Sequence, residues 1–201
     1  NILSDEMASI IEEFRGTMII DSTSLSKRRI PLALRRQLTQ LIALSLRPDI
    51  KNLEIRHEMS GRPYLYSSEA SIELPLISIS HSGPWIGIIL SDPSAYATLD
   101  LEDITLPRSH ASLSNNFFSK TEKDLVLDQG VLGFLKLWTA KEAIAKWQGE
   151  GIDFVLKLDL GHALQDVVLK EPMPLCIEGK EYTLIQNMLE GKLFYTVCYR
   201  E

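Results

Sequence analysis

Apolar residues recur along this chain with two periods, and each period predicts a different kind of element. Where they return every three or four positions, the pattern predicts amphipathic helices. Where they alternate with polar residues or form short β-branched runs, it predicts strands. Helices are expected over residues 7–15, 31–46 and 132–147, with one more beginning at Lys120 after a capping box. Strands are expected over residues 17–20, 54–57, 76–80, 85–90, 96–101, 153–159, 165–169, 181–187 and 193–199.

The order of these elements predicts an α+β protein built from two similar α/β halves in one chain. Helix precedes strands near the start of the chain, and the same order returns in its second part. We therefore expect an N-terminal half over residues 1–103 and a C-terminal half over residues 104–201. The repetition concerns only the order of elements, because no convincing internal sequence identity accompanies it.

Composition narrows the class of protein. The chain has 201 residues, of which 45% are hydrophobic and 24% charged, and this suits a globular protein with a substantial core. The net charge of −6 argues against general nucleic-acid binding. No apolar run approaches the roughly 18 residues that a membrane span needs. No secretory signal is visible and the cysteines Cys176 and Cys198 lack metal-ligand spacing, so a reducing cytoplasm is the expected setting.

Basic residues gather near the amino terminus despite the acidic total. The cluster contains Lys27, Arg28, Arg35 and Arg36. Such a cluster offers a place for phosphate groups. A solvated helix face explains the same residues, and the sequence leaves both interpretations open.

Two carboxylates stand in the apolar run around residue 100. Asp100 and Glu102 are two positions apart, so both side chains lie on one face if this segment is a strand. Like charges on one face repel unless a cation or a donor lies between them. Mg²⁺ suits such a pair because it prefers carboxylate, phosphate and water oxygens. The alternative is an ordinary solvent-facing strand end.

The predicted helix over residues 132–147 carries a second polar group. Trp138, Glu142 and Lys146 follow one another at four-residue spacing, beside the apolar stripe of Leu137 and Ile144. The simplest explanation is a surface ion pair between Glu142 and Lys146. An acid next to a lysine also provides a base and a proton donor, and the large Trp138 indicates that this side of the helix is partly covered.

His81 follows Ser80 at the end of a predicted strand, before the turn at Gly83-Pro84. A lone histidine is more often structural, although this place also suits a phosphate contact. The Gly-x-Ser-x-Gly elbow of hydrolases is missing, and so are the Walker A and Gly-x-Gly-x-x-Gly loops. Nucleophilic serine hydrolases, P-loop kinases and dinucleotide enzymes are therefore disfavoured.

Taken together, these segments resemble the Sfp-type 4′-phosphopantetheinyl transferases. Five segments match the motifs of that family in the family's order. They are Gly61-Arg62-Pro63, Ser78-Ile79-Ser80-His81-Ser82-Gly83, Leu99-Asp100-Leu101-Glu102, Asn116-Phe117-Phe118-Ser119-Lys120-Thr121-Glu122, and Leu137-Trp138-Thr139-Ala140-Lys141-Glu142-Ala143 with Lys146, Gly149 and Gly151. Each motif alone is modest, but five in order are highly specific.

The resemblance implies an activity and a fold. The phosphopantetheine arm of coenzyme A would move to a serine of an acyl, peptidyl or aryl carrier protein, with release of 3′,5′-ADP. The fold would be the pseudo-dimeric one of this family, with the active site between the two halves, and a monomer is expected. Fatty-acid, polyketide and nonribosomal-peptide carriers all remain open.

The resemblance also assigns roles to residues. Asp100, Glu102 and Glu142 would hold Mg²⁺ on the coenzyme A pyrophosphate. Glu142 would take the proton from the serine, and Lys146 would stabilise or protonate the departing phosphate. The residues expected to bind coenzyme A are Lys27, Arg28, Arg35, Arg36, Arg62, Pro63, Ser80 and His81.

Two positions depart from the family pattern. Thr98 stands where the family usually has glycine, and Arg62 stands where it usually has lysine. Neither removes a reacting group, because arginine keeps the charge and binds phosphate in a bidentate manner. Two alternatives to transfer are a non-catalytic relative that binds coenzyme A or a carrier protein, and a metal-dependent phosphoesterase that uses the same acids.

Overall fold

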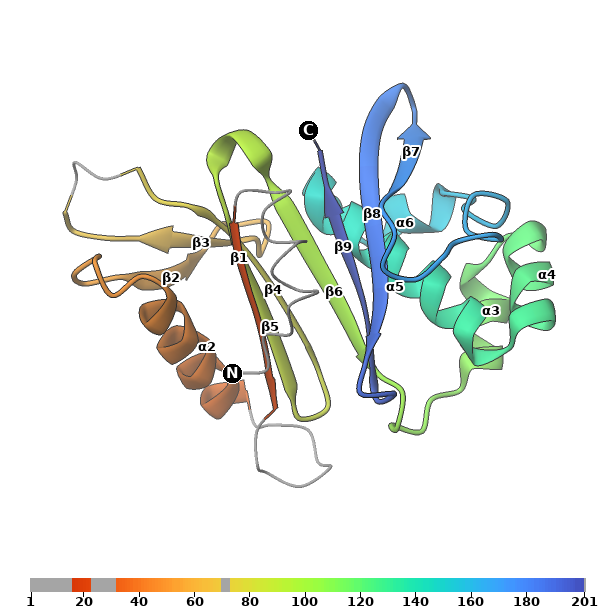
Figure 1. The fold of residues 1–201 in the computed structure, drawn as a ribbon, viewed down its shortest axis with the longest axis horizontal. Helices are drawn as coiled ribbons and strands as arrows, with labels where there is room; N and C mark the ends of the chain where they lie inside the picture. Colours follow the sequence, from red (N-terminus) through yellow and green to blue (C-terminus); the bar gives the residue numbers. More distant parts are fainter. Residues whose placement is uncertain (1–15, 23–31, 70–72, 201) are drawn as a thin grey trace. The chain divides into compact units, whose positions relative to one another are not determined.

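The computed structural model describes residues 16–22, 32–69 and 73–200 (Figure 1). The chain divides into two compact units, one formed by Asn1–Leu99 with Tyr199–Glu201 and the other by Asp100–Cys198. The helix expected over residues 7–15 lies outside the described residues, as do Lys27 and Arg28. The arrangement is a mixed α/β one, and each unit has its own sheet and helices.

The first unit contains a small antiparallel sheet, a helix and a two-stranded ribbon (Figure 1). Sheet order is β1-β5-β4, and the ribbon pairs β2 with β3. Its described elements are β1 (Gly16–Ser22), α2 (Leu32–Leu46), β2 (Glu54–His57), β3 (Pro63–Tyr66), β4 (Leu76–Ser82), β5 (Trp85–Ser91) and the short 3₁₀ helix η1 (Pro93–Ala95). The strand β6 (Ala97–Asp103) then leads into the second unit, which begins at Asp100.

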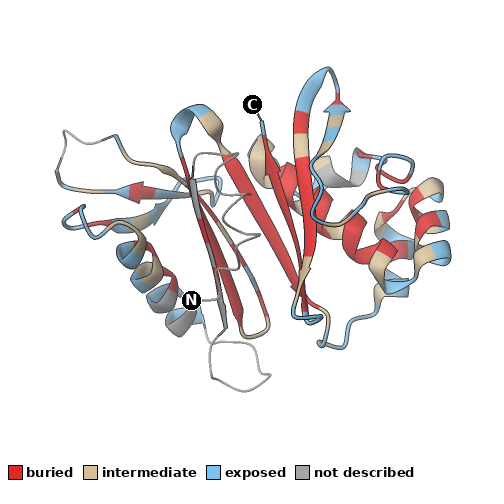
Figure 2. Cartoon of the chain, in the orientation of Figure 1, coloured by how far each residue is buried: buried red, intermediate tan, exposed pale blue. Residues whose placement is uncertain are grey.

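The second unit combines a four-stranded sheet with four described helices. Strand order in the sheet is β6-β9-β8-β7. The other elements are α3 (His110–Phe117), α4 (Lys120–Gln129), α5 (Val131–Gln148), α6 (Ile152–Lys157), β7 (Met173–Ile177), β8 (Lys180–Leu189) and β9 (Leu193–Tyr199). The central strand β9 is buried along its whole length, as β6 is (Figure 2).

Burial follows the apolar pattern in the first unit. Every residue of β5 is buried, as its central place in the sheet requires (Figure 2). Ile77, Ile88 and Leu90 of this sheet pack with Leu53 and Leu65 from the segments around the ribbon. The ribbon therefore shares the core of the sheet and is held through its apolar side chains.

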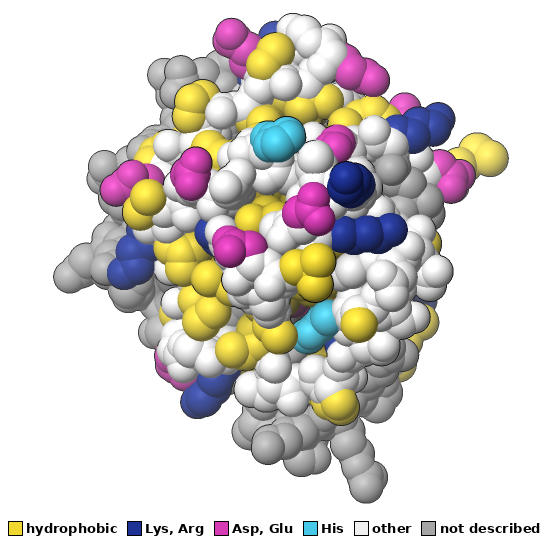
Figure 3. Space-filling model, turned by 90° about the vertical axis from the view of Figure 1, so that its right-hand side faces the viewer, with side chains coloured by type: hydrophobic (Ala, Val, Ile, Leu, Met, Phe, Trp, Pro, Cys, Tyr) yellow, Lys and Arg dark blue, Asp and Glu magenta, His cyan; other side chains and the backbone are white. Residues whose placement is uncertain are grey.

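The surface carries both signs of charge. On the face shown in Figure 3, acidic and basic side chains are interspersed, with apolar side chains between them. Within the described part of the chain, none of the helices combines the length and the hydropathy needed to cross a membrane.

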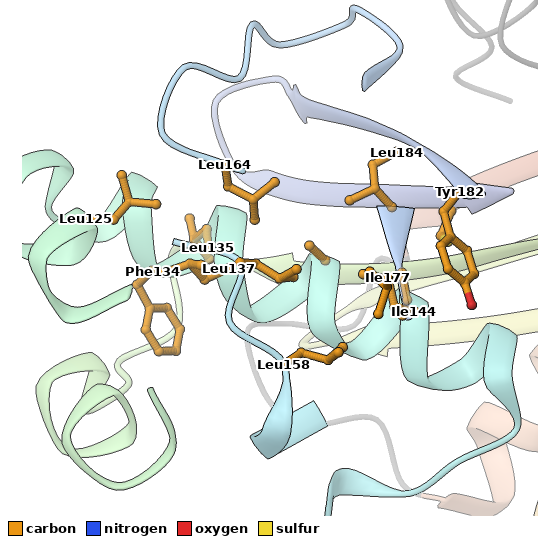
Figure 4. Packing of buried hydrophobic residues seen from close by; sticks show 14 of the residues in the cluster. Leu125, Phe134, Leu135, Leu137, Ile144, Leu158, Leu164, Ile177, Tyr182 and Leu184 are labelled. Atoms are coloured by element: carbon orange, nitrogen blue, oxygen red, sulfur yellow. The ribbon is translucent and has the colours of Figure 1, made fainter. Parts of the chain in front are cut away.

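The helix α5 organises the core of the second unit. Phe134, Leu137 and Ile144 are fully buried, and they belong to the same hydrophobic core as Tyr182 and Leu184 of β8 (Figure 4). Gly149 ends this helix in the left-handed conformation, with φ of 71°, and its N–H bonds back to the carbonyls of the last turn. The helix thus packs on the sheet and ends about two turns after Glu142, and both features position its polar residues.

Most predicted elements are confirmed, with two exceptions. Residues 153–159 were expected to form a strand, but α6 occupies Ile152–Lys157. Residues 165–169 were also expected to form a strand, but they form turns and irregular backbone, and the next residue, Lys170, donates its N–H to Gln186 O at 2.8 Å. In both segments apolar side chains pack in the core around α5, as Leu158 does in the first (Figure 4) and Val167 in the second, so burial without sheet pairing produced a strand-like pattern.

Candidate functional site

The last turn of α5 is joined to β6 by an ion pair between residues 46 positions apart. Lys146 Nζ donates to Asp100 Oδ1 at 2.7 Å. Asp100 is 6% exposed, as is Glu102, so the solvent-facing alternative for these two acids is wrong. The strand and the helix singled out in the sequence therefore meet within the second unit, through oppositely charged groups.

Glu142 belongs to the same electrostatic group. Its side chain lies one helical turn before Lys146 and is half-buried. Burial raises the pKa of Glu142 because it disfavours the ionised form, and the neighbouring Asp100 carboxylate raises it further, while Lys146 opposes both effects. Asp100, Glu142 and Lys146 are thus mutually coupled, and a proton on Glu142 is held more tightly than on an ordinary glutamate.

Glu102 has a cationic partner of its own. Arg108 Nη1 donates to Glu102 Oε1 at 2.6 Å. Arg108 lies in the loop between β6 and α3, and nothing in the sequence pattern pointed to it. A lone arginine in a polar loop carries no periodic signal, so only the fold shows that it returns to the strand it follows.

The donor chemistry of this group fits a hard divalent cation. Asp100, Glu102 and Glu142 offer carboxylate oxygens, and Lys146 and Arg108 offset part of their negative charge. Over the described ranges, no group of three or more His, Cys, Asp and Glu side chains is disposed to hold a metal ion. The three acids are therefore of the right type, while the structure holds two of them in ion pairs and does not gather all three around one point.

A buried ion pair beside this group was missed in the sequence. Lys141 Nζ lies 2.8 Å from Glu122 Oε1 and donates to Leu158 O at 2.7 Å. Glu122 also accepts from Leu160 N and Ser119 N, each at 2.9 Å. One cluster thus ties α5 to the start of α4 and to the segment after α6.

A signal for this pair was present. Lys141 lies four residues after Leu137 and three before Ile144, on the apolar stripe of the helix, and this position indicates that it is buried. A buried lysine needs an oppositely charged or hydrogen-bonding partner. The predicted capping box at the start of α4 is confirmed, with Ser119 as the N-cap and Glu122 as the acid that completes it. Its second role, as the counter-ion of Lys141, depends on tertiary packing.

Trp138 is covered by aromatic neighbours from α3 and from its own helix. Its ring stacks on Phe134 with centroids 5.8 Å apart and lies 6.2 Å from Phe117. His110 packs on the same Phe134 at 4.5 Å. Burial lowers the pKa of His110, and the positive charge of Arg108 lowers it further. The helix α3 thus explains why a large aromatic side chain occupies the polar side of α5.

The remaining predicted residues belong to the first unit. Ser80 is buried and His81 exposed within β4, which continues through both to Ser82. Arg62 lies over the ring of Tyr96, 4.5 Å from its centroid, and Pro63 begins β3. Arg36 is exposed on α2, whereas the side chain of Arg35 lies outside what is described.

Comparisons with known proteins agree with the predicted family. Residues 99–170 match the family model described as the 4′-phosphopantetheinyl transferase superfamily. The chain is 26% identical over 146 residues to a protein of Thraustochytrium named phosphopantetheinyl transferase. This alignment covers 65% of the present chain and 49% of that protein. Two bacterial relatives carry the provisional name 4′-phosphopantetheinyl transferase. The relative from Synechocystis is 32% identical, in an alignment that covers 60% of this chain and 50% of the relative. The relative from Haemophilus influenzae is 29% identical, in an alignment that covers 57% of this chain and 48% of the relative.

The matched region includes the acids of β6 and all of α3, α4 and α5. The chain spans about half the length of the curated relatives it matches, at 48 to 50%. The predicted resemblance is confirmed at the level of the superfamily, and the Sfp type stays a prediction.

Proposed function

We propose that this chain, whose residues 99–170 match the model of the 4′-phosphopantetheinyl transferase superfamily, transfers the phosphopantetheine arm of coenzyme A to a serine of a carrier protein. The observation that carries the proposal is the coupled group of Asp100, Glu142 and Lys146, inside the segment that matches the family. We also propose that the enzyme is of the Sfp type. The serine oxygen would bond to the phosphorus next to pantetheine, and 3′,5′-ADP would leave with the electrons of the broken P–O bond.

Glu142 is the candidate general base. Its raised pKa gives its carboxylate a greater affinity for a proton than an ordinary glutamate has. It would accept the serine hydroxyl proton as the new P–O bond forms. The negative charge of Asp100 helps to raise the pKa of Glu142, and the positive charge of Lys146 limits that rise.

Lys146 is the candidate acid on the leaving side. Its ammonium group already binds an oxyanion, Asp100 Oδ1, and a phosphate oxygen of the departing 3′,5′-ADP offers the same chemistry. Its position in the last turn of α5 is fixed by the left-handed cap at Gly149. The lysine would therefore stabilise negative charge as it develops, without a large rearrangement of the helix.

Asp100, Glu102 and Glu142 are the residues that would hold Mg²⁺. When bound, Mg²⁺ would neutralise the pyrophosphate and orient it for displacement. Arg62, Ser80, His81 and Arg36 remain candidates for binding coenzyme A, together with Lys27, Arg28, Arg35 and Pro63. Arg62, Pro63, Ser80 and His81 are supported by their match to the family's motifs, and Arg36 by its charge and its exposed place on α2.

The direct test is mass spectrometry of apo carrier proteins incubated with the chain, coenzyme A and Mg²⁺. A panel of fatty-acid, polyketide and nonribosomal-peptide carriers should show the addition of one phosphopantetheine to at least one member. Glu142→Gln should slow that addition by about 10²- to 10⁴-fold, the usual contribution of a general base. Glu150→Gln removes an exposed acid just beyond α5 and should leave the rate unchanged.

The same experiment separates the alternatives. An unchanged mass for every carrier, with coenzyme A binding seen by calorimetry, favours the non-catalytic relative. Release of free phosphopantetheine without a carrier favours the phosphoesterase. Either result would replace the proposed transfer.

A further inference from the structure

Arg108 has no part in the proposed reaction, yet its guanidinium holds one of the candidate metal ligands. The Nη1–Oε1 distance to Glu102 is 2.6 Å, and the side chain of Glu102 is only 8% exposed. Arg108 itself is about one-third exposed, at 32%. The contact is therefore a charge-assisted hydrogen bond that reaches from the surface into a buried carboxylate.

The loop after β6 is built to make this contact. Asp103 Oδ1 accepts hydrogen bonds from Thr105 N at 2.8 Å and from Thr105 Oγ1 at 2.7 Å. Leu106 N bonds back to Asp103 O at 3.3 Å, and Ile104 N bonds to Lys192 O at 2.9 Å. These bonds turn the chain directly after Glu102, so that Arg108, six residues on, returns to β6.

A guanidinium and a divalent cation compete for the same carboxylate oxygen. They also repel each other, because both are positive and the site is largely buried. We propose that Arg108 is a built-in counter-ion, which occupies Glu102 and is displaced when a divalent cation binds there. This inference rests on the metal ligands of the proposed function, and it concerns a residue that takes no part in the proposed transfer.

The role of such a counter-ion is to hold the buried carboxylate of Glu102 in place while the cation is absent. The cost is a weaker affinity for the cation. Removal of the arginine should therefore strengthen cation binding.

The test measures Mn²⁺ affinity by electron paramagnetic resonance, because Mn²⁺ takes the same oxygen donors as Mg²⁺. The full chain is compared with Arg108→Gln, which should bind Mn²⁺ about ten- to a hundredfold tighter, the range expected when one charged hydrogen bond no longer competes. Arg108→Lys keeps the charge and should stay closer to the unmodified chain. Arg47→Gln is the matched control, since Arg47 pairs with Asp49 at 2.7 Å in the first unit.

Circular dichroism of each variant establishes that the fold is intact. An Mn²⁺ affinity that is unchanged or weaker in a folded Arg108→Gln protein would overturn the inference, as would retention of the full affinity in Glu102→Gln. If Arg108→Gln tightens Mn²⁺ binding and no carrier protein gains mass, the counter-ion role of Arg108 is supported and the proposed transfer is refuted. If carriers are modified and Arg108→Gln leaves Mn²⁺ binding unaltered, the transfer stands and the counter-ion fails.

Discussion

Lys141 Nζ and Glu122 Oε1 lie 2.8 Å apart, and both side chains are closed to solvent. Lys141 directly precedes Glu142, so the contact that anchors α5 adjoins the residue proposed to move a proton. Replacement of Lys141 by methionine would leave Glu122 charged and buried, which typically costs about 3–5 kcal/mol. We expect the free energy of unfolding, measured by urea denaturation, to fall by about that amount.

The control for this prediction is Lys192→Met. Lys192 pairs with Glu190 at 3.6 Å, with side chains 58% and 45% exposed, and its loss should cost less than about 1 kcal/mol. The double variant Lys141→Met/Glu122→Gln should recover part of the stability lost in Lys141→Met, since it leaves no unpaired charge. Equal losses of unfolding free energy in Lys141→Met and Lys192→Met would show that the buried ion pair does not anchor α5.

The titration of Glu142 should respond to its two charged neighbours in opposite directions. Asp100→Asn removes a negative charge and should lower the pKa of Glu142, whereas Lys146→Met removes a positive charge and should raise it. Carbon-detected NMR of the Glu142 carboxyl group in metal-free buffer measures both shifts. Shifts of the same sign in the two variants would show that these residues are not coupled as the structure indicates.

His110 should make the second unit sensitive to mild acid. Its pKa in the folded chain lies below the ordinary value of 6.5, so the unfolded chain binds the proton more readily. Stability should therefore decline as pH falls from about 6.5 toward the lower, folded-state pKa. His110→Phe keeps a ring on Phe134 and should flatten this part of the stability profile in urea denaturation.

The exposed His162 of the same unit gives the matched control. His162→Phe should retain the decline that His110→Phe removes. A profile that keeps its full acid sensitivity in His110→Phe would assign the effect to other groups.

Gly161 should tolerate no side chain. A Cβ at this position would lie 2.6 Å from Thr121 C and 2.8 Å from Glu122 N, and both are backbone atoms at the start of α4. Gly161→Ala should therefore destabilise the chain by about 1–3 kcal/mol, the usual cost of overpacking. Thermal denaturation measures the loss, and Gly151→Ala is the control, because a Cβ there meets nothing within 4 Å.

The sequence predicted the elements that build the site. The strand of Asp100, the capping box of α4 and the limits of α5 all follow from local chemistry, since apolar period, caps and a terminal glycine act over a few residues. The helix α3 escaped notice because its sequence is short and mostly polar, with only Leu113 and Phe117 to pack against the core. The edge strand β7 escaped because Pro174 interrupts a short run.

Contacts between distant segments were beyond the sequence pattern. Spacing favoured an ordinary i,i+4 pair between Glu142 and Lys146, whereas in the fold Lys146 reaches Asp100. The attachment of Arg108 to Glu102 depends on a turn whose direction is set by side-chain hydrogen bonds. Such contacts are set by tertiary packing and cannot be predicted from local helix or strand propensity.

Asp100, Glu102 and Glu142 and their two cationic partners all belong to the unit formed by residues 100–198. The two charged neighbours that shift the pKa of Glu142, Asp100 and Lys146, therefore lie in the same unit as Glu142 itself. We expect natural variation in residues 1–99 to change binding of the proposed donor more than the protonation of Glu142, so that the two properties can evolve at separate rates.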